Sequence, residues 1–293
     1  MTGEQRAAPG AVIVISSHVV RGTVGNRAAV FALEHLGHRV WAVPTVTLPW
    51  HPGHGRATRI VPPSDQFAAL LQDLGRAPWL DEVDAVLTGY LGDAEQAVAV
   101  AELVDAVKTR NPDALYLCDP VMGDVDGLYV PEATAAAMRD VLLPAADIAT
   151  PNRFELEWLA GKELADNAAL SRAASELAAE TVLVTSAHAM MAGSIGNLLV
   201  TPREVLLAEH RAIANPPNGT GDLASALFLA RRLQGMATEK ALQMTAAAVF
   251  EVVARAVKRG SDELMLETDA QSLSHPMAMV QTRRLVTPGG RHA

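Results

Sequence analysis

The segment AVIVISSHVVRGTVGNRAAVFALEHLGHRVWAV, residues 11–43, contains an apolar run, an amphipathic stretch and a second apolar run. Residues 11–15 predict a buried strand, because consecutive apolar residues leave no polar face for solvent. Residues 25–36 predict a helix with one apolar face, which ends at Gly37. Residues 39–43 predict a second strand. A strand, a helix and a strand in this order are typical of two parallel strands joined by a helical crossover.

The same alternation continues along the rest of the chain. It predicts one α/β domain over residues 1–293, with a mainly parallel central sheet and helices on both faces. Residues 195–200 and 204–208 predict an antiparallel hairpin at one edge of the sheet, and residues 1–10 and 286–293 are predicted to be loose tails. Further strands are expected at 85–87, 114–118, 147–149 and 181–184, and further helices at 64–74 (with Ser64 as N-cap), 94–108, 132–141, 153–159, 170–179, 223–233 and 239–256.

Composition and charge limit the functions open to this protein. Hydrophobic residues make up 49% of its 293 residues, enough for a sizeable core. The formal net charge of −9 disfavours nucleic acid as a partner, because binding to phosphate backbones needs clustered Lys and Arg. No apolar run approaches the roughly 18 residues of a membrane helix, so we expect no membrane partner. The single cysteine, Cys118, excludes an intramolecular disulfide, and together these features favour a cytoplasmic protein.

Polar or small residues follow the predicted strands. In an open parallel sheet, ligands bind beyond the carboxyl ends of the strands, so these residues are candidates for a binding site. In chain order they are Ser16-Ser17-His18, Thr45 with His51, Gly89-Tyr90, Asp119, Thr150-Pro151-Asn152 and Thr185-Ser186.

The main candidate for phosphate binding is Gly219-Thr220-Gly221-Asp222, directly before an apolar helix. Two glycines allow backbone N–H groups to turn inward, and the positive end of the helix dipole adds to their attraction for an anion. Asp222 has the chemistry to accept a proton from an attacking hydroxyl. The alternative interpretation is an Asp N-cap after a glycine-rich loop. The chain has no P-loop motif, and no G-x-G-x-x-G follows the first strand, which counts against a P-loop enzyme and a dinucleotide oxidoreductase.

Two acidic positions and a histidine pair are further candidates. Asp119 follows a buried strand, where its carboxylate is placed to hold Mg²⁺, although Asp-Pro also ends strands without a function. Asn152 and Glu155 have the spacing of a helix capping box, and Glu155 is also expected to face the water shell of a metal. His51 and His54 have i, i+3 spacing without a carboxylate or cysteine nearby, which favours a mobile flap over a metal site.

Together these residues resemble the ribokinase-like superfamily, and most closely its pyridoxal kinase branch, across nearly the whole chain. Each motif is weak alone, but the ordered set is specific. The resemblance implies a three-layer α/β/α fold with a short flap, and a homodimer. The matching elements are Ser17-His18-Val19-Val20 with Gly25-Asn26, Gly89-Tyr90-Leu91-Gly92, Asp119-Pro120-Val121-Met122-Gly123, Thr150-Pro151-Asn152 with Glu155-Leu156-Glu157, and Gly219-Thr220-Gly221-Asp222.

The resemblance also implies a reaction, in which ATP phosphorylates the 5′-hydroxymethyl group of pyridoxal, pyridoxine or pyridoxamine in vitamin B6 salvage. Asp222 would be the general base, and the backbone of Gly219, Thr220 and Gly221 would form the anion hole. Asp119 and Glu155 would organise Mg²⁺. The implied vitamer-binding residues are Ser17, Val19, Thr45, His51, Tyr90 and Asp222. The implied ATP-binding residues are Asp119, Thr150, Asn152, Glu155, Thr185, Ser186, Gly219, Thr220 and Gly221, with residues 211–217 beside the adenine.

Two positions depart from the family pattern. Some relatives carry a Lys where this chain has Thr185-Ser186, so Mg²⁺ or a monovalent cation, K⁺ or Na⁺, is expected to neutralise more of the phosphate charge. Many bacterial relatives have His-Thr-Gln-Tyr in the flap where this chain has His51-Pro52-Gly53-His54, which leaves the choice among vitamers open.

Two other functions remain open at this point. One is a hydroxymethylpyrimidine kinase of thiamin synthesis, which shares the fold and the Asp base. The other is a non-catalytic protein that binds B6 vitamers. The intact Asp222, Asp119 and Glu155 count against the binding protein.

Overall fold

The computed structural model describes residues 10–285 of the chain. Its strands are β1 (Ala11–Val19), β2 (Arg39–Leu48), β3 (Val83–Thr88), β4 (Leu115–Cys118), β5 (Gly123–Asp124), β6 (Gly127–Leu128), β7 (Ile148–Ala149), β8 (Thr181–Ala187), β9 (Ser194–Val200), β10 (Val205–Arg211) and β11 (Gln281–Leu285). Its α-helices are α1 (Asn26–His35), α2 (Ser64–Gly75), α3 (Gln96–Arg110), α4 (Glu132–Ala137), α5 (Arg153–Ala160), α6 (Asn167–Ser175), α7 (Thr220–Leu233), α8 (Thr238–Arg259) and α9 (Ala270–Ser274).

Within residues 10–285, one large sheet has the strand order β11-β10-β9-β8-β7-β4-β3-β1-β2. The strands from β8 to β2 pair in parallel. Strands β9, β10 and β11 extend the sheet by antiparallel pairing at one edge. The predicted parallel sheet with an antiparallel hairpin at its edge is therefore confirmed.

Strand β1 shows why the opening apolar run decides the architecture. Val12 and Val14 belong to the core on one face of the sheet, and Ile13 and Ile15 belong to the core on the other face. All four side chains are fully buried, and burial of each one stabilises the fold by about 1.5–3 kcal/mol. A strand that is covered on both faces does not need alternating polar and apolar residues, because neither face meets solvent.

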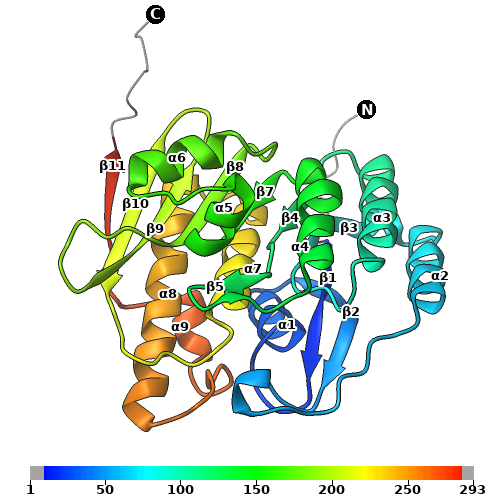
Figure 1. The fold of residues 1–293 in the computed structure, drawn as a ribbon, viewed down its shortest axis with the longest axis horizontal. Helices are drawn as coiled ribbons and strands as arrows, with labels where there is room; N and C mark the ends of the chain where they lie inside the picture. The colour runs from blue at the N-terminus through cyan, green and yellow to red at the C-terminus, as the bar shows by residue number, and fades with distance from the viewer. Residues whose placement is uncertain (1–9, 286–293) are drawn as a thin grey trace, which may run out of the picture.

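Helices cover both faces of the sheet, which gives the three layers seen in Figure 1. On one face, α2 and α3 contribute Leu71 and Leu103 to the core. On the other face, α1, α7 and α8 contribute Leu33, Leu227 and Leu242. The expected α/β/α arrangement is confirmed.

Some predicted boundaries are wrong. Ser64 is the first residue of α2, and Pro63 occupies the N-cap position, so Ser64 does not cap the helix. The helix expected at 170–179 begins earlier, at Asn167, because the Asp166 side chain caps it by accepting the N–H of Ala169 at 2.7 Å. The helix expected at 132–141 is α-helical only to Ala137 and then continues as a π turn.

The loose tails predicted for residues 1–9 and 286–293 lie outside the described residues. Gly10 was included in the first tail, but it is buried and its N–H donates to Asp84 Oδ2 at 2.7 Å, so that prediction is wrong for Gly10.

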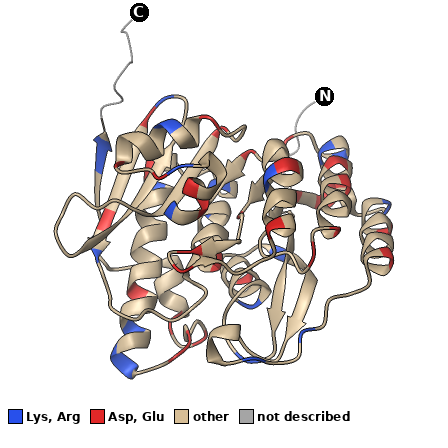
Figure 2. Cartoon of the chain, viewed as in Figure 1, with Lys and Arg blue, Asp and Glu red and all other residues tan. Residues whose placement is uncertain are grey.

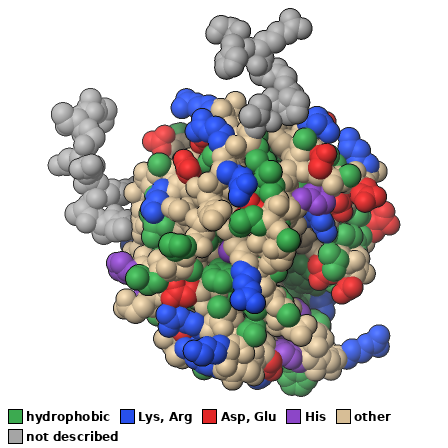
Figure 3. Space-filling view, turned by 90° about the vertical axis from the view of Figure 1, so that its left-hand side faces the viewer, with side chains coloured by type: hydrophobic (Ala, Val, Ile, Leu, Met, Phe, Trp, Pro, Cys, Tyr) green, Lys and Arg blue, Asp and Glu red, His purple; other side chains and the backbone are tan. Residues whose placement is uncertain are grey.

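Charged residues are dispersed over the molecule. Figure 2 shows Lys and Arg interspersed with Asp and Glu over the helices and loops. On the side that carries β11, charged and hydrophobic side chains are also intermixed (Figure 3). No helix within residues 10–285 is long and apolar enough to cross a membrane.

Candidate active site

The turn Gly219-Thr220-Gly221-Asp222 forms the start of helix α7. Gly219 has a φ of 91°, and a Cβ added there would lie 2.1 Å from the carbonyl oxygen of Thr23, so glycine alone fits. Gly219 occupies the N-cap position and Asp222 is the third residue of the helix, so the interpretation of Asp222 as the N-cap is wrong. The first N–H groups of a helix lack helical acceptors, which makes this turn suitable for an anion.

The Asp222 carboxyl lies where the start of α7 meets the start of α1, beside Gly25. It is half-buried, and burial raises its pKa to about 6, although the backbone N–H groups of Gly25 and of Asp222 itself act to lower it. Gly25 in turn packs against Ser17, since a Cβ on Gly25 would lie 2.3 Å from the Ser17 hydroxyl oxygen. A carboxyl with this pKa is mainly deprotonated at neutral pH and still basic enough to take a proton from a hydroxyl in a transition state.

Asp119, at the end of β4, is joined to the same helix. Its Oδ2 accepts a hydrogen bond from the Ser225 hydroxyl at 2.9 Å, and Ser225 Oγ lies 2.9 Å from Thr150 Oγ1. Burial and, second, the nearby Asp222 carboxyl raise the pKa of Asp119 to about 7, although hydrogen bonds from Ser225 and Thr150 act to lower it. The structure thus brings together three predicted residues, Asp119, Thr150 and Asp222. Ser225 was not predicted, although it lies three residues after Asp222 and therefore on the same helix face.

Asn152 and Glu155 form the predicted capping box at the start of α5, which is confirmed. Asn152 Oδ1 accepts the N–H of Glu155 at 2.9 Å, and Glu155 Oε2 accepts the N–H of Asn152 at 2.7 Å. Glu155 Oε1 also accepts the N–H of Met122 at 3.0 Å. Both Glu155 oxygens therefore hold backbone around Asp119, and its place in the water shell of a metal stays a prediction.

Buried carboxyl groups and a tyrosine gather at this point. Burial raises the pKa of Glu155 well above its usual value, with Asp119 as the next cause. Tyr129 is 51% exposed overall, but burial of its hydroxyl and then the negative charges of Glu155, Asp119 and Asp222 raise its pKa. Tyr129 was not predicted, and its position in the loop after Asp119 was the only available signal. Like charges this close favour the binding of a cation among them.

The chemistry of this acidic group suits a shared magnesium site. Within the described residues, no cluster of three or more His, Cys, Asp or Glu side chains is arranged to hold a metal by itself. Mg²⁺ is commonly held by one or two carboxylates together with substrate phosphates. The residues present therefore fit Mg²⁺ that arrives with a nucleotide.

The predicted ring-binding residues lie together at the ends of β1, β2 and β3. Val19 is fully buried in a small apolar cluster against which Tyr90 packs. The Thr45 hydroxyl is also buried and donates to the Tyr90 carbonyl oxygen at 2.7 Å, which fixes the position of Tyr90. Arg59 Nη2 donates to the Tyr90 hydroxyl at 3.4 Å, a contact that an isolated arginine in a loop did not signal. Binding of a ring by these residues stays a prediction.

The flap reaches the glycine-rich turn at the start of α7. His51 Nδ1 accepts the N–H of Gly53 at 3.1 Å and so caps the 3₁₀ turn Pro52–His54. Burial lowers the pKa of His51, with His54 as the second cause, which keeps this nitrogen available as an acceptor. A Cβ on Gly53 would lie 3.5 Å from Asn218 Nδ2, so the tip of the flap lies against the residue that precedes Gly219.

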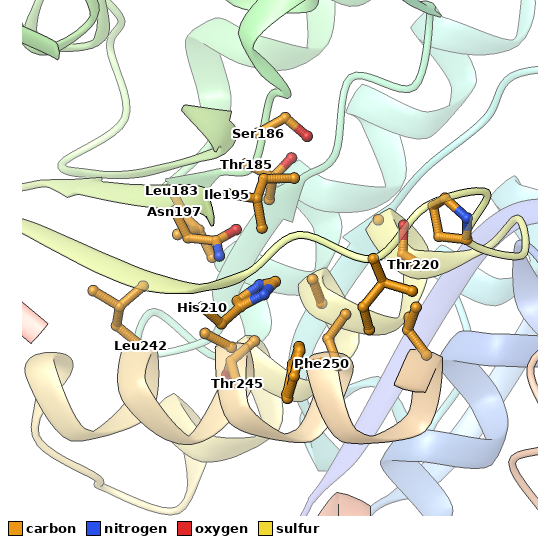
Figure 4. A pocket seen from close by; sticks show the side chains of 17 residues that line it. Leu183, Thr185, Ser186, Ile195, Asn197, His210, Thr220, Leu242, Thr245 and Phe250 are labelled. Carbon is orange, nitrogen blue, oxygen red and sulfur yellow. The ribbon is translucent and has the colours of Figure 1, made fainter. Parts of the chain in front are cut away.

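A cleft opens between the sheet and α8, at the end of β8 and the start of β9 (Figure 4). Thr185 and Ser186, at the end of β8, line it together with Thr220 and Gly221 of the glycine-rich turn. Ser186 has a φ of 54°, which is uncommon for a residue other than glycine. Four of the residues predicted to bind ATP thus border one cavity.

The rest of the lining of this cleft is mainly apolar. Ile213 and Pro216, from the segment predicted to border the adenine, line it together with Val249 and Phe250 of α8. His210 also lines the cleft, beside Phe250. An apolar slot next to a glycine-rich turn at a helix start has the shape and chemistry for a nucleotide.

Comparison with known proteins agrees with this arrangement. The family model described as phosphomethylpyrimidine kinase matches residues 64–267. A pyridoxal kinase PdxY from Rubrobacter xylanophilus is 38% identical over 281 residues, which cover 94% of this chain and 97% of the relative. The PdxY of Corynebacterium diphtheriae is 33% identical over 280 residues, with 94% and 99% coverage.

A solved structure gives the same picture. Pyridoxal kinase from Leishmania donovani in complex with ADP and pyridoxamine superposes with a TM-score of 0.88 at 28% identity, over 94% of this chain and 100% of that one. The fold is therefore ribokinase-like. The identities over nearly full length and the carboxyl groups around helix α7 agree, and the chain belongs to the pyridoxal kinase family.

Proposed function

We propose that this chain transfers the γ-phosphoryl group of ATP to the 5′-hydroxymethyl group of pyridoxal, and also of pyridoxine and pyridoxamine, in the salvage of pyridoxal 5′-phosphate. The observation that carries the proposal is the position of Asp222. Its carboxyl lies on the first turn of α7, between the Ser17 side of the site and the cleft that Thr220 and Gly221 line. A base and anion-binding N–H groups on one turn are what phosphoryl transfer to a hydroxyl requires.

In the proposed reaction, Asp222 accepts the proton of the hydroxymethyl group as its oxygen attacks the γ-phosphorus. The bond between that phosphorus and the β–γ bridging oxygen breaks, and ADP leaves. The N–H groups of Gly219, Thr220 and Gly221 stabilise the charge that is spread over the transferring group. Removal of such a base or donor commonly costs 10²- to 10³-fold in rate.

We also propose that Mg²⁺ binds with the nucleotide beside Asp119 and Glu155, where it would neutralise charge on the phosphates. Asp119 is the better candidate for a direct ligand, because both Glu155 oxygens already accept backbone N–H groups. Glu155 then acts by holding the backbone of Met122 and Asn152 in place. The lack of a Lys at Thr185-Ser186 supports a need for a monovalent cation, K⁺ or Na⁺, and a cation titration of the rate tests this.

The vitamin B6 specificity is supported by the relatives. The Leishmania donovani kinase has been solved with pyridoxamine and, in another structure, with pyridoxine, each together with ADP. In this chain, Ser17, Val19, Thr45, His51 and Tyr90 are the proposed vitamer contacts. The altered flap around His51 is the part of this site that we expect to set the order of preference among vitamers.

A second candidate function is the phosphorylation of hydroxymethylpyrimidine, a pyrimidine related to the one in the description of the matching family model, phosphomethylpyrimidine kinase. The deciding experiment measures ADP release with pyridoxal, pyridoxine, pyridoxamine and hydroxymethylpyrimidine, each with and without Mg²⁺. We expect magnesium-dependent turnover that is fastest with a B6 vitamer. Faster turnover of hydroxymethylpyrimidine than of any B6 vitamer would favour the second candidate function. Binding of vitamers without any ATP consumption would support a non-catalytic binding protein.

We further propose that the protein works in the cytoplasm as a homodimer. Both statements rest on the family to which the chain belongs. Analytical ultracentrifugation at micromolar concentration tests the dimer, and a sedimentation coefficient of a 31.0 kDa monomer would refute it.

A further inference from the structure

His210 occupies a fixed place in the wall of the nucleotide cleft. Side chains alternate along β10, so His210 lies on the same face as Leu206 and Ala208, which pack in the core beneath α7 and α8. Phe250 of α8 packs against the imidazole, with ring centroids 5.1 Å apart and an interplanar angle of 45°. Figure 4 shows the imidazole between Asn197 and the helix that carries Phe250.

A backbone contact determines which ring nitrogen carries the proton. His210 Nδ1 lies 3.1 Å from the carbonyl oxygen of Arg211. A carbonyl oxygen only accepts hydrogen bonds, so Nδ1 must be the donor. Burial lowers the pKa of His210, against the opposing effect of the Arg211 carbonyl, and the ring is therefore neutral at neutral pH. In this tautomer Nε2 presents a lone pair, and it has no hydrogen-bond partner within residues 10–285.

We propose that His210 Nε2 accepts a hydrogen bond from the 6-amino group of the purine and thereby selects adenine nucleotides over 6-oxopurine nucleotides. The proposal rests on the proposed function, because it assigns the apolar part of the cleft around His210 and Phe250 to the base of ATP. A 6-oxo group would set one acceptor against another and leave both without a donor in a partly dry cleft. A site built around one hydrogen bond discriminates strongly against a ligand that cannot make it.

Two other polar side chains that line the cleft, Asn197 and Thr245, do not discriminate between 6-amino and 6-oxo groups in the same way. Asn197 carries both a donor and an acceptor, and its amide can turn over to suit either ligand. The Thr245 hydroxyl accepts from Arg231 Nη1 at 3.0 Å, and its own proton is free to rotate. His210 is the group whose acceptor character is fixed by its surroundings, because turning the ring would break the bond to Arg211.

The test compares three triphosphates with pyridoxal as acceptor: ATP, inosine triphosphate and purine riboside triphosphate. Inosine triphosphate exchanges the 6-amino group for an oxo group, and purine riboside triphosphate lacks any group at position 6. We expect the wild type to prefer ATP over either analogue by about 10-fold or more in kcat/KM. In His210→Phe, which keeps an aromatic ring against Phe250, we expect kcat/KM for ATP to fall about 10-fold while the values for the analogues stay within about 3-fold of wild type.

Ile195→Val is the matched control, since Ile195 lines the same cleft and is paired with His210 across the β9–β10 ladder. Ile195→Val should change kcat/KM for all three triphosphates by the same factor. If His210→Phe does so too, or if the wild type does not prefer ATP, the proposal is wrong. His210→Asn provides a second variant in case the Phe variant fails to fold by circular dichroism, and it should likewise lose the preference.

Direct binding separates this proposal from the proposed function. Calorimetric titration of ADP and inosine diphosphate requires no turnover and no vitamer. A wild-type preference for ADP that disappears in His210→Phe would support the role of His210 even if no B6 vitamer is phosphorylated. Equal affinity of the wild type for the two diphosphates would refute it even if pyridoxal is a good substrate.

Discussion

The Ser225 hydroxyl donates to Asp119 Oδ2 at 2.9 Å and so joins two residues that lie 106 positions apart in the chain. Ser225 lies on the first part of α7, about one helical turn beyond Asp222, and Asp119 directly follows β4. The bond therefore couples the position of the proposed base to that of the proposed metal ligand. A shift of either element would disturb both groups at once.

Ser225→Ala is expected to weaken the use of nucleotide and metal. Because the Ser225 hydroxyl acts to lower the pKa of Asp119, its loss should raise that pKa and leave more of the carboxyl protonated at pH 7. We expect the KM for MgATP to rise about 3- to 10-fold, with part of the loss recovered at pH 8.5. Steady-state kinetics at both pH values measure this. Ser175→Ala on α6 is the control, and an equal effect there would contradict the prediction.

Asp222→Asn tests the base. The amide keeps the size of the side chain but cannot take the hydroxyl proton, so kcat should fall about 10²-fold or more while the Kd for pyridoxal changes by less than about 3-fold. Rapid-quench kinetics and equilibrium titration give the two values. Asp65→Asn, an exposed aspartate in the first turn of α2, should leave both unchanged. A Kd that rises in step with the loss of kcat would instead assign Asp222 to binding.

The pH profile should show the same group. The pKa of Asp222 is raised to about 6, so below that pH the carboxyl is protonated and cannot act as a base. We expect kcat/KM for pyridoxal to decline as the pH falls through about 6, and Asp222→Asn to remove this limb from the residual activity. Coupling to Asp119, whose pKa is about 7, should broaden the limb beyond a single titration. A profile that is flat between pH 5 and 7 would count against this role.

The proposed anion-binding role of the backbone at the start of α7 can be tested at Gly219. Gly219 and Gly235 both have left-handed φ, 91° and 74°, but a Cβ meets the Thr23 carbonyl only at Gly219 and has open space at Gly235. Gly219→Ala should therefore displace the turn and reduce kcat about 10²-fold or more, whereas Gly235→Ala should cost only about 1 kcal/mol of stability. Kinetics and thermal melts of both variants check this. Equal kinetic effects would mean that the turn does not carry the anion site.

Much of the fold was predictable because the sheet is buried on both faces. The run at Val12–Ile15 has no polar face, and this distinguishes a central parallel strand from a surface one. The same logic fails at the sheet edge. Strand β11 has the sequence QTRRL, and it is recognisable only through its pairing with β10, a contact between distant parts of the chain. The local pattern of polar and apolar residues therefore does not predict strand β11.

The site divides in a similar way. Asp119, Asn152, Glu155 and the glycine-rich turn were predictable because chemistry and position after strands coincide in the sequence. The N-cap interpretation of Asp222 could be excluded only from the backbone of the turn, which places Gly219 at the N-cap position. The sequence alone does not determine that backbone. Ser225, Tyr129 and Arg59 act through contacts across the fold, and their spacing in the chain carries little of that information.

Asp119→Asn should lower the activity and raise the Tm, and the rise in Tm should depend on pH. Burial raises the pKa of Asp119 from 3.8 to about 7, so between these values the folded state binds more protons than the unfolded state, and stability falls as the pH rises. The penalty for the buried charge is absent below the unfolded pKa and fully present above the folded one. The variant removes the charge while its amide oxygen still accepts from Ser225. We therefore expect the Tm of the variant to exceed that of wild type by several degrees at pH 8 and by much less at pH 5.

Thermal melts of wild type, Asp119→Asn and the exposed Asp113→Asn at the two pH values provide the measurement. Asp113→Asn should track the wild type at both, because its carboxyl is already in water and its removal relieves no buried charge. Activity of Asp119→Asn should fall at every pH, since the carboxylate that destabilises the folded chain is the one proposed to attract the cation with the nucleotide. A Tm difference of the same size at pH 5 and pH 8 would show that packing, and not the charge of Asp119, separates the two proteins.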